Sequence, residues 1–547
     1  MKIALAQLNY HTGNFEENSR RIREHIEKAK SDQIDLIVFA ELALTGYPPR
    51  DFLEFKEFLD ACEEQINKIA DVCHGITCIL GAPARNKQRK GKRLHNAAYV
   101  LSSGKVQEVV HKALLPTYDV FDEYRYFEPA NSVQCVEIGG LKIALSICED
   151  LWNIGDSGLY AGQPMDRLMQ GNPDLMINIA ASPFSRYHIE TRKEVLKENC
   201  LHYQLPLLYV NHVGAQTELI FDGGSLAMNA DGSLVDEMAY FDEEFKCYDF
   251  NEGVLEQIGE DHTFLPQERT ALIHDALVTG IRDYFRKLGF KKALLGSSGG
   301  IDSAVVLALC AKALGPENVL AVLMPSRYSS DHSVNDAIKL SENLGTPYEL
   351  ISIEEPFKAF ENTLSKPFQG LAPDLTEENI QARARGVILM ALSNKFGSIL
   401  LNTSNKSENA VGYGTLYGDM CGGLSVIGDL YKTQVYELAR FINKEKEIIP
   451  ENIISKAPSA ELRPDQKDSD SLPDYEELDT ILYQYIENRK GPKELIADGH
   501  DAKLVHRIIR LVNLNEYKRY QAPPILRVSS KAFGMGRRMP IVAKYLQ

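Results

Sequence analysis

The chain has 547 residues, a formal net charge of −16 at pH 7, 44% hydrophobic residues and 25% charged residues. This length exceeds what one hydrophobic core can organise, and a prior of about 150 residues per domain predicts two to four domains. The acidic charge disfavours nucleic acid as a partner, and no apolar run approaches the roughly 18 residues that a membrane helix needs. We therefore expect a soluble globular protein with neither nucleic acid nor membrane as a partner.

Cysteine usage and the first residues predict the compartment. Nine cysteines are scattered without Cys-x-x-Cys pairs, which is typical of free thiols in a reducing cytoplasm. The segment Lys2–Gln7 is typical of a strand and lacks the long apolar core of a signal peptide. Both observations predict a cytoplasmic location.

The first part of the chain alternates short apolar runs with helical stretches, which indicates an α/β fold. An acidic stretch with little periodicity follows. We interpret residues 246–264 as a linker that joins a domain of residues 1–245 to a domain of residues 265–547. The predicted strands of the first domain are Ile3–Leu8, Asp35–Phe39, Thr77–Gly81, Ala97–Leu101, Ile143–Ile147, Leu175–Ile179, Leu207–Val210 and Ser225–Asn229.

The second part restarts with an amphipathic helix over residues 267–288. Strands and helices then alternate, which predicts a doubly wound parallel sheet whose ligands bind beyond the carboxyl ends of its strands. The predicted strands are Ala293–Leu295, Val319–Met324, Tyr348–Ile353 and Ser398–Leu401, and the helices between them include Ile301–Leu314 and Asp331–Leu344.

The segment Leu294–Ala304 has the composition of a loop that binds pyrophosphate. Small residues after an apolar strand let backbone N–H groups approach an anion, and the following helix directs its positive end at the same place. Asp302 at the helix start is a candidate ligand of a Mg²⁺ ion that bridges phosphates. The other candidate loop residues are Gly296, Ser297, Ser298, Gly299, Gly300, Ile301 and Ser303.

Other interpretations of this segment stay open. It lacks the Gly-Lys-Ser/Thr ending of a Walker A loop. It satisfies Gly-x-Ser-x-Gly through Ser298, the pattern of a serine-hydrolase nucleophile, which needs Asp and His partners later in the chain. It is also compatible with a plain Gly-rich turn. The Ser-Gly-Gly-x-Asp-Ser signature itself resembles the pyrophosphate loop of ATP pyrophosphatases, which adenylate a substrate and release pyrophosphate.

Three reactive residues of the first domain follow predicted strands or lie close to them: Glu41, Lys112 and Cys148. A thiol needs a base to become a thiolate, and a carboxylate in a dry pocket serves this purpose. A cation such as Lys112 then stabilises the oxyanion of a tetrahedral intermediate. Taken singly, a cysteine at a strand end is more often a buried small hydrophobe, and the two charges are more often surface charges.

The context of these residues resembles the three signature blocks of the nitrilase family, in the family's order: Phe39–Tyr47, His111–Pro116 and Ser146–Asp150. The resemblance covers about residues 1–250 and implies an amidase on an α-β-β-α sandwich.

The nitrilase resemblance also implies roles for single residues. It makes Glu41 the general base, Lys112 the oxyanion donor and Cys148 the nucleophile. Trp152, the only tryptophan, either closes over the substrate or is a core aromatic residue. The set implied to bind glutamine, with Glu123 as an auxiliary glutamate, is Tyr118, Glu123, Ser182 and Phe184.

A second polar segment, residues 402–408, follows a predicted strand of the second domain and supplies hydroxyls, a cation and a carboxylate. Mg²⁺ prefers oxygen ligands and keeps several waters, so Asp302 and Glu408 together with ATP phosphates form a suitable metal site. Lys432 begins an amphipathic helix, where a cation opposes the helix dipole unless an anionic phosphate lies nearby.

Residues 265–547 resemble NAD synthetases, a family of N-type ATP pyrophosphatases. The matching segments are Ser298–Ser303, Asn379–Arg385, Thr403–Glu408, Lys456–Leu462 and Ser529–Gly534. The resemblance implies that the loop Gly296–Ser303 holds pyrophosphate and metal, and that Met324, Ser326, Thr403 and Lys432 contact ATP. One departure is the strand ending at Pro325, which lacks an arginine that we expect in some ammonia-dependent relatives. The implied deamido-NAD set is Arg383, Glu408, Asp419 and Lys531.

Arg383 and Arg385 lie on one predicted helix, residues 379–396. At i and i+2 they do not share a helix face, so we expect at most one of them to reach a given ligand group. Arg383 is the one we assign to the dinucleotide.

The two resemblances together match the glutamine-dependent NAD synthetases. They imply that ammonia from glutamine travels through an internal tunnel to a carboxylate that ATP has adenylylated, which converts deamido-NAD to NAD with release of AMP and pyrophosphate. The implied partners are ATP, glutamine, deamido-NAD, Mg²⁺ and further copies of the chain in a homo-oligomer. Alternatives are another ATP-pyrophosphatase amidotransferase with a different carboxylate or nucleotide, and a nucleotide sensor with an inactive nitrilase scaffold.

Overall fold

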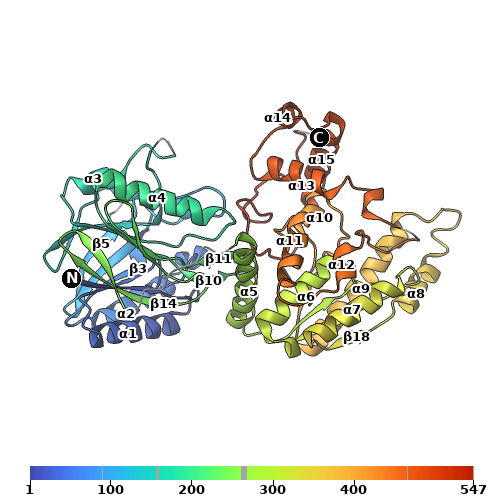
Figure 1. Cartoon of the computed structure of the whole chain (residues 1–547), viewed down its shortest axis with the longest axis horizontal. Helices are drawn as coiled ribbons and strands as arrows, with labels where there is room; N and C mark the ends of the chain where they lie inside the picture. Colours follow the sequence, from blue (N-terminus) through green and yellow to red (C-terminus); the bar gives the residue numbers. More distant parts are fainter. Residues whose placement is uncertain (89, 156–158, 260–267, 465, 546–547) are drawn as a thin grey trace. The chain divides into compact units, whose positions relative to one another are not determined.

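A computed structural model describes the chain over residues 1–88, 90–155, 159–259, 268–464 and 466–545. The chain forms two compact units, Met1–Pro266 and Gln267–Gln547, which Figure 1 shows in blue to green and in green to red. Within the described residues no helix is both long and apolar enough to cross a membrane.

Seven strands of the first unit form a mixed sheet: β1 (Lys2–Gln7), β2 (Leu36–Phe39), β3 (Thr77–Arg85), β4 (Leu94–Ser102), β5 (Lys105–His111), β14 (Glu244–Asn251) and β15 (Val254–Ile258). Their order is β15-β14-β1-β2-β3-β4-β5. The central strands β1, β2 and β3 are parallel, and the outer pairs are antiparallel.

A second sheet of the same unit has six strands: β6 (Val136–Ile138), β7 (Leu141–Ile147), β8 (Leu175–Ile179), β9 (Leu207–Val210), β12 (Leu226–Met228) and β13 (Leu234–Glu237). Their order is β13-β12-β9-β8-β7-β6, with β7, β8 and β9 parallel. A separate hairpin joins β10 (Val213–Gln216) and β11 (Leu219–Asp222).

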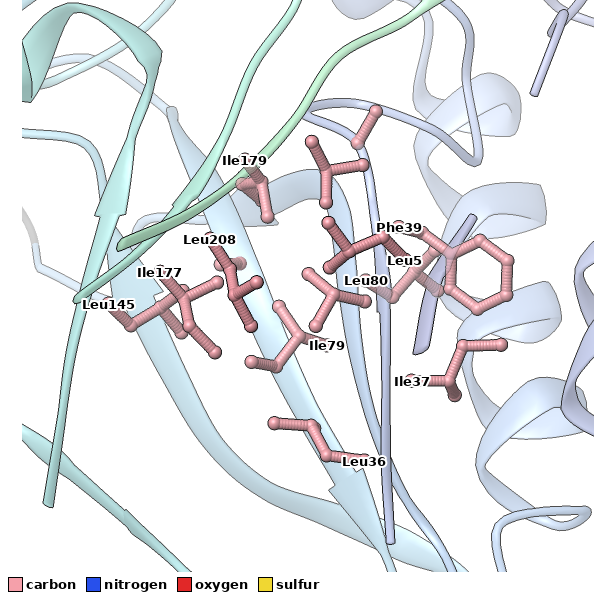
Figure 2. Close-up of a cluster of buried hydrophobic side chains, with 14 of the residues drawn as sticks. Leu5, Leu36, Ile37, Phe39, Ile79, Leu80, Leu145, Ile177, Ile179 and Leu208 are labelled. Carbon is pink, nitrogen blue, oxygen red and sulfur yellow. The ribbon is translucent and has the colours of Figure 1, made fainter. Parts of the chain in front are cut away.

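The hydrophobic core of the first unit joins the two sheets. Leu36 and Ile79 come from one sheet, Ile177 and Leu208 come from the other, and their side chains meet in Figure 2. The helices α1 (Phe15–Ser31) and α2 (Lys56–Ala70) lie on one side of these sheets, and α3 (Pro164–Met169) and α4 (His188–Tyr203) lie on the other (Figure 1). The central strands are therefore covered on both faces, which explains their continuous apolar runs. This arrangement is the expected α-β-β-α sandwich.

The linker expected over residues 246–264 is wrong for its first part. β14 pairs with β1, and β15 pairs with β14, so the chain up to Ile258 completes the sheet of the first unit. In β14 buried positions alternate with half-buried and exposed ones, and this hairpin at the edge of the sheet lacks the continuous apolar run that marks a central strand. Residues 260–264 lie outside the described residues.

The second unit contains a five-stranded parallel sheet: β16 (Ala293–Gly296), β17 (Val319–Leu323), β18 (Tyr348–Leu350), β19 (Ile399–Asn402) and β20 (Leu424–Ser425). Its order is β18-β17-β16-β19-β20, so the chain leaves β16 first toward one edge and then toward the other. The doubly wound prediction is confirmed. Ligands in such sheets bind where the winding direction changes, next to β16.

Helices surround this sheet and form a separate lobe. α5 (Arg269–Leu288) and α6 (Ile301–Leu314) pack on each other, and the lobe joins helices α10 and α13 to α15 around an apolar cluster. The remaining bounds are α7 (Asp331–Leu344), α8 (Glu354–Leu364), α9 (Leu375–Phe396), α10 (Lys406–Val411), α11 (Lys432–Ile442), α12 (Glu451–Ser455), α13 (Tyr475–Ile486), α14 (Pro492–Ala497), α15 (Ala502–Leu514) and α16 (Glu516–Arg519).

Candidate active sites

The three reactive residues of the first unit lie just beyond strand ends. Glu41 follows β2, Lys112 follows β5, and Cys148 follows β7 of the other sheet. All three are buried. The ends of the two sheets thus bring residues from distant parts of the sequence into one site.

Lys112 is the centre of a buried ion cluster. Its Nζ donates to Glu41 Oε1 at 2.7 Å and to both carboxylate oxygens of Glu123 at 2.9 Å. The hydroxyl of Tyr47 donates to Glu123 Oε1 at 2.9 Å, and the backbone N–H of Ala181 donates to Glu41 Oε2 at 2.9 Å. One ammonium between two carboxylates leaves a net negative charge, so this cluster can accept a proton.

The charges of the cluster control the protonation of Lys112. Burial by itself lowers the pKa of the Lys112 ammonium, but the neighbouring carboxylates of Glu123 and Glu41 outweigh burial and raise this pKa well above its usual value. Lys112 is therefore a fixed cation in a dry site, which is the property required to stabilise an oxyanion.

Cys148 is a protonated thiol in the resting site. Burial raises the pKa of its thiol well above the usual value, the carboxylate of Glu41 raises it further, and the ammonium of Lys112 opposes both. A base must therefore remove the thiol proton during the reaction. The backbone of Cys148 has a φ of 42°, in the left-handed region that a residue with a side chain adopts only when its surroundings hold it there.

The residues expected to bind glutamine lie around this site with different partners. The hydroxyl of Tyr118 donates to Glu149, the residue after Cys148, at 2.9 Å, and Tyr160 donates to the same carboxylate at 2.9 Å. Phe184 is buried and packs edge-on against Phe241. Glu123, which was expected to be an auxiliary glutamate, is part of the ion cluster itself.

Ser182 and Trp152 share one partner. The Oγ of Ser182 lies 2.8 Å from Nε2 of His188, and the His188 ring stacks on Trp152 with ring centres 5.0 Å apart. Because His188 begins α4, this contact fixes the indole ring close to the segment that carries Ser182.

Asn96 belongs to the ion cluster and was missed by the sequence analysis. Its side-chain amide donates to Glu41 Oε1 at 2.6 Å and to Glu123 Oε2 at 3.3 Å. It thus joins the two carboxylates that flank Lys112. Asn96 lies inside β4, where a polar residue in an apolar run was the only available signal.

The second unit has a cavity of about 630 Å³ beyond the carboxyl end of its sheet. It collects most of the predicted residues from six segments of the sequence. Three predicted residues do not line the cavity: Ser303, Ser326 and Lys531. Ser329, close to Ser326 in the sequence, does line it. The predicted residues that line it are Gly296, Ser297, Ser298, Gly299, Gly300, Ile301, Asp302, Met324, Arg383, Thr403, Glu408, Asp419 and Lys432.

The pyrophosphate loop depends on one glycine. Gly299 has a φ of +75°, and a Cβ built on it would lie 2.2 Å from the carbonyl oxygen of Ser333. No other residue type fits both conditions. Ser303 braces the loop from within, because its Oγ accepts from the backbone N–H of Ser298 at 3.2 Å and donates to Gly300 O at 3.0 Å.

The serine-hydrolase interpretation of Ser298 finds no support. The described residues that line the cavity include no histidine to act as its base. The hydroxyl of Ser298 instead lies 3.2 Å from the hydroxyl of Ser303 and accepts from the backbone N–H of Gly300.

Asp302 and Glu408 approach each other across Lys432. The Lys432 ammonium bonds Asp302 Oδ2 and lies 3.5 Å from Glu408 Oε1. Burial and the facing carboxylate of Asp302 raise the pKa of Glu408 to about 8. The single positive charge of Lys432 does not balance two carboxylates, so their oxygens can also ligate Mg²⁺ that is held jointly with phosphate oxygens. Within the described residues no group of three or more His, Cys, Asp or Glu side chains is arranged to hold a metal by itself.

Asn405 fixes the geometry of these two carboxylates. Its side-chain amide donates to Asp302 Oδ1 at 2.9 Å, and its Oδ1 caps α10 by accepting the backbone N–H of Glu408 at 2.9 Å. The residue is fully buried.

Both arginines of α9 line the cavity, although they lie at i and i+2. The Arg383 Nε donates to Leu416 O at 3.2 Å at an exposed position, and the Arg385 Nε donates to Met324 O at 3.0 Å. Burial lowers the pKa of the Arg385 guanidinium to about 10. Arg385 is therefore a further candidate for an anionic ligand group beside the assigned Arg383.

Comparison with known proteins assigns the family. Residues 2–251 match the carbon-nitrogen hydrolase family model, and residues 273–522 match the NAD synthase family model. A glutamine-dependent NAD(+) synthetase from Synechocystis is 44% identical over 552 residues, 99% of each chain. This chain belongs to the glutamine-dependent NAD(+) synthetase family. The Acinetobacter baylyi member is 42% identical over 549 residues, which cover 99% of this chain and 98% of that protein.

Solved structures of the family agree over the full length. The glutamine-dependent NAD+ synthetase of Acinetobacter baumannii in complex with ADP is 39% identical, with a TM-score of 0.78, over 99% of this chain and 98% of that chain. The enzyme from Cytophaga hutchinsonii has a TM-score of 0.83 at 22% identity over 99% and 98%, which shows the shared fold.

Lys531 was expected at the dinucleotide, and the structure shows how its segment is held. The carboxylate of Asp429 accepts the backbone N–H groups of Val528 and Ser529 at 2.8 and 2.7 Å. Lys406, fully buried, lies 2.9 Å from the same carboxylate. These contacts tie the C-terminal segment of this family member to the helix α10 that carries Glu408.

Proposed function

We propose that the two units divide glutamine-dependent NAD synthesis, with glutamine hydrolysed in the first and deamido-NAD activated by ATP in the second. The family assignment makes the chain a ligase that forms a carbon–nitrogen bond. One observation supports this division: the two charged clusters occur in separate units. The first unit contains the Glu41–Lys112–Glu123 cluster with Cys148. The second unit contains the Asp302–Lys432–Glu408 cluster.

In the first unit Glu41 accepts the proton of the Cys148 thiol as the sulfur attacks the side-chain amide carbon of glutamine. The ammonium of Lys112 donates to the oxyanion that forms. Glu41 returns the proton to the leaving nitrogen, so ammonia departs and a thioester remains. Water, deprotonated by Glu41, then cleaves the thioester to glutamate and restores the thiol.

In the second unit the carboxylate of deamido-NAD attacks the α-phosphorus of ATP, and pyrophosphate leaves toward the loop Gly296–Ser303. Ammonia attacks the resulting acyl-adenylate and displaces AMP. The Gly299 turn and the start of α6 hold the leaving pyrophosphate by backbone N–H groups, and Lys432 supplies a fixed cation. Asp302 and Glu408 would hold Mg²⁺ together with phosphate oxygens, and the ion would neutralise charge on the phosphates. Met324 and Thr403 contact ATP, and Arg383, Asp419 and Lys531 hold the dinucleotide.

Ammonia stays unprotonated on its way between the two centres, because ammonium has no lone pair for the attack. Glutamine labelled with ¹⁵N in its amide, assayed with excess unlabelled ammonium, separates this route from release into solvent. Transfer inside the enzyme predicts NAD that carries the label, and release into solvent predicts dilution of the label to the bulk value.

The chain assembles into a homo-oligomer in the cytoplasm. α9 supports assembly, because it leaves the large apolar side chains of Leu375, Val387, Met390 and Phe396 exposed. All nine cysteines are free, which fits a reducing compartment. Sedimentation of the purified protein tests the assembly, and a single species at the mass of one chain overturns it.

The decisive assay supplies deamido-NAD and ATP with either glutamine or ammonium and follows NAD, AMP and pyrophosphate. The proposal predicts equal amounts of NAD, AMP and pyrophosphate with either nitrogen donor, and glutamate only with glutamine. Formation of ADP and phosphate in place of AMP and pyrophosphate contradicts the adenylylated intermediate.

A further inference from the structure

A buried carboxylate that the mechanism does not use lies two residues after the nucleophile. Asp150 is nearly inaccessible to solvent. Its Oδ1 accepts the backbone N–H groups of Ala113 at 3.0 Å and Leu114 at 2.8 Å, and its Oδ2 accepts the backbone N–H of Ile147 at 3.2 Å. Burial raises the pKa of this carboxyl group to about 7, and the three backbone N–H donors oppose that rise because they favour its charged form.

These three donors flank two reactive residues on different sheets. Ala113 and Leu114 directly follow Lys112, and Ile147 directly precedes Cys148. Asp150 thus joins the end of β5 to the end of β7. On its other side, Lys112 is held by its own backbone N–H, which donates to Asn96 O at 2.8 Å.

The strained backbone of the nucleophile needs such a support. A φ of 42° is strained for a residue that carries a side chain, and it persists only where neighbouring contacts prescribe the conformation. The Asp150 bond to Ile147 N–H closes the turn that contains Cys148. One side chain therefore fixes the turn of the nucleophile and also ties it to the strand of the oxyanion donor.

We propose that Asp150 is a positioning residue of the glutaminase reaction, which holds the Cys148 turn against the Lys112 segment through three backbone N–H bonds. The inference rests on the proposed roles of Lys112 and Cys148. Because Asp150 does not touch the substrate, its loss changes the alignment of the reacting groups and not the set of groups present.

The test compares Asp150→Asn and Asp150→Ala with the matched control Asp174→Asn. An asparagine has one acceptor oxygen, so at least one backbone N–H loses its partner, whereas alanine frees all three. Asp174 also accepts a backbone N–H, from Lys142 at 2.8 Å, but at the opposite end of β7 and β8 from the site.

We expect Asp150→Asn to lower kcat with glutamine by about 10- to 100-fold, with KM for glutamine changed by less than about threefold. Asp150→Ala lowers kcat further. Ammonia-dependent NAD synthesis stays at the wild-type level in Asp150→Asn, and so does the thermal unfolding of the full chain, which shows that both units are folded. The rate at which iodoacetamide alkylates Cys148 also differs between Asp150→Asn and the wild-type protein. Asp174→Asn leaves kcat with glutamine unchanged.

Retention of glutamine kcat within threefold in Asp150→Asn overturns the inference, and so does a rise in KM at constant kcat. Cys148→Ala separates this failure from failure of the proposed function. If Cys148→Ala still uses glutamine, the glutaminase assignment is wrong. If Cys148→Ala is inactive with glutamine and Asp150→Asn is not impaired, only the positioning role is wrong.

Discussion

Both candidate sites place one lysine ammonium between two carboxylates, but they differ in how far these groups are open to a ligand. In the first unit the ammonium of Lys112 is enclosed by Glu41 and Glu123 at 2.7–2.9 Å, all three buried. In the second unit the polar groups line a cavity of about 630 Å³, where Asp302 and Glu408 repel each other across Lys432.

The difference follows from which reacting groups belong to the protein and which arrive with the substrates. A thioester mechanism takes its nucleophile, base and oxyanion donor from the protein, so its reacting groups are in place before the substrate arrives. In adenylylation the substrates bring the phosphates, and the protein provides backbone donors and a surplus of carboxylate for a metal. A preorganised site and a site completed by its ligands are thus joined in one chain.

The largest expected difference between the two sites concerns Cys148, the proposed nucleophile of the first unit. We expect Cys148→Ala to lower glutamine-dependent NAD synthesis by at least about 10³-fold, because no other group supplies the nucleophile, while ammonia-dependent synthesis is unchanged. Steady-state assays with each donor measure the effect. Cys200→Ala, at a buried free cysteine of α4, is the control and keeps both activities. Loss of ammonia-dependent turnover in a folded Cys148→Ala protein contradicts the division of labour.

The second prediction concerns a substitution in the second unit, which we expect to lower both activities. We expect Asp302→Ala to lower both glutamine- and ammonia-dependent synthesis by about 10²-fold or more, because removal of one carboxylate weakens phosphate-bound metal and frees Lys432 from its partner. NAD formation across a Mg²⁺ titration measures the effect. The control Asp331→Asn changes a carboxylate in the first turn of α7, outside the cavity lining. A variant that loses only the glutamine-dependent activity disproves the assignment.

The third prediction concerns the backbone of the loop Gly296–Ser303 and tests whether this loop binds phosphate. Gly299→Ala adds a methyl group 2.2 Å from Ser333 O at a φ of +75°, so the loop must shift. We expect KM for ATP to rise at least about tenfold in both assays. The control Gly289→Ala has the same strain, at a φ of +79°, with no atom within 4 Å, and we expect only a loss of stability of about 1 kcal/mol. Equal ATP affinities of the two variants contradict a phosphate-binding role of the turn.

The smallest expected effect concerns the pH dependence of the first unit. Burial and the neighbouring His95 lower the pKa of His111 from 6.5 to about 4, and the two rings stack with centres 3.9 Å apart. The unfolded chain binds this proton first as the pH falls from 6.5 to 4, so the free energy of unfolding decreases in this window.

We expect His111→Gln to reduce this acid destabilisation by about 1 kcal/mol, a small value because the ring is only half-buried. Denaturant unfolding at pH 7 and pH 4.5 measures it. His74→Gln, at an exposed position of the same unit, is the control. An equal loss of stability between the two pH values in wild type and His111→Gln excludes this contribution.

Much of the fold was predictable because apolar runs mark central strands. Leu175–Ile179, Leu207–Val210, Ile301–Leu314 and Asp331–Leu344 have the bounds predicted from sequence. The hairpin of β14 and β15 was missed, because an edge strand shows half-buried polar positions and resembles a linker.

By itself, the sequence determined the two kinds of chemistry and their order along the chain. Reactive residues at strand ends, in blocks that resemble two families, were sufficient for that, because each block is local. The tertiary structure decided which groups meet. Lys112 lies 71 residues from Glu41, and Asn96 and Asp150 take their roles from strands that become neighbours only when the sheets form. Contacts between strand ends depend on strand order and register, which no local pattern of residues specifies.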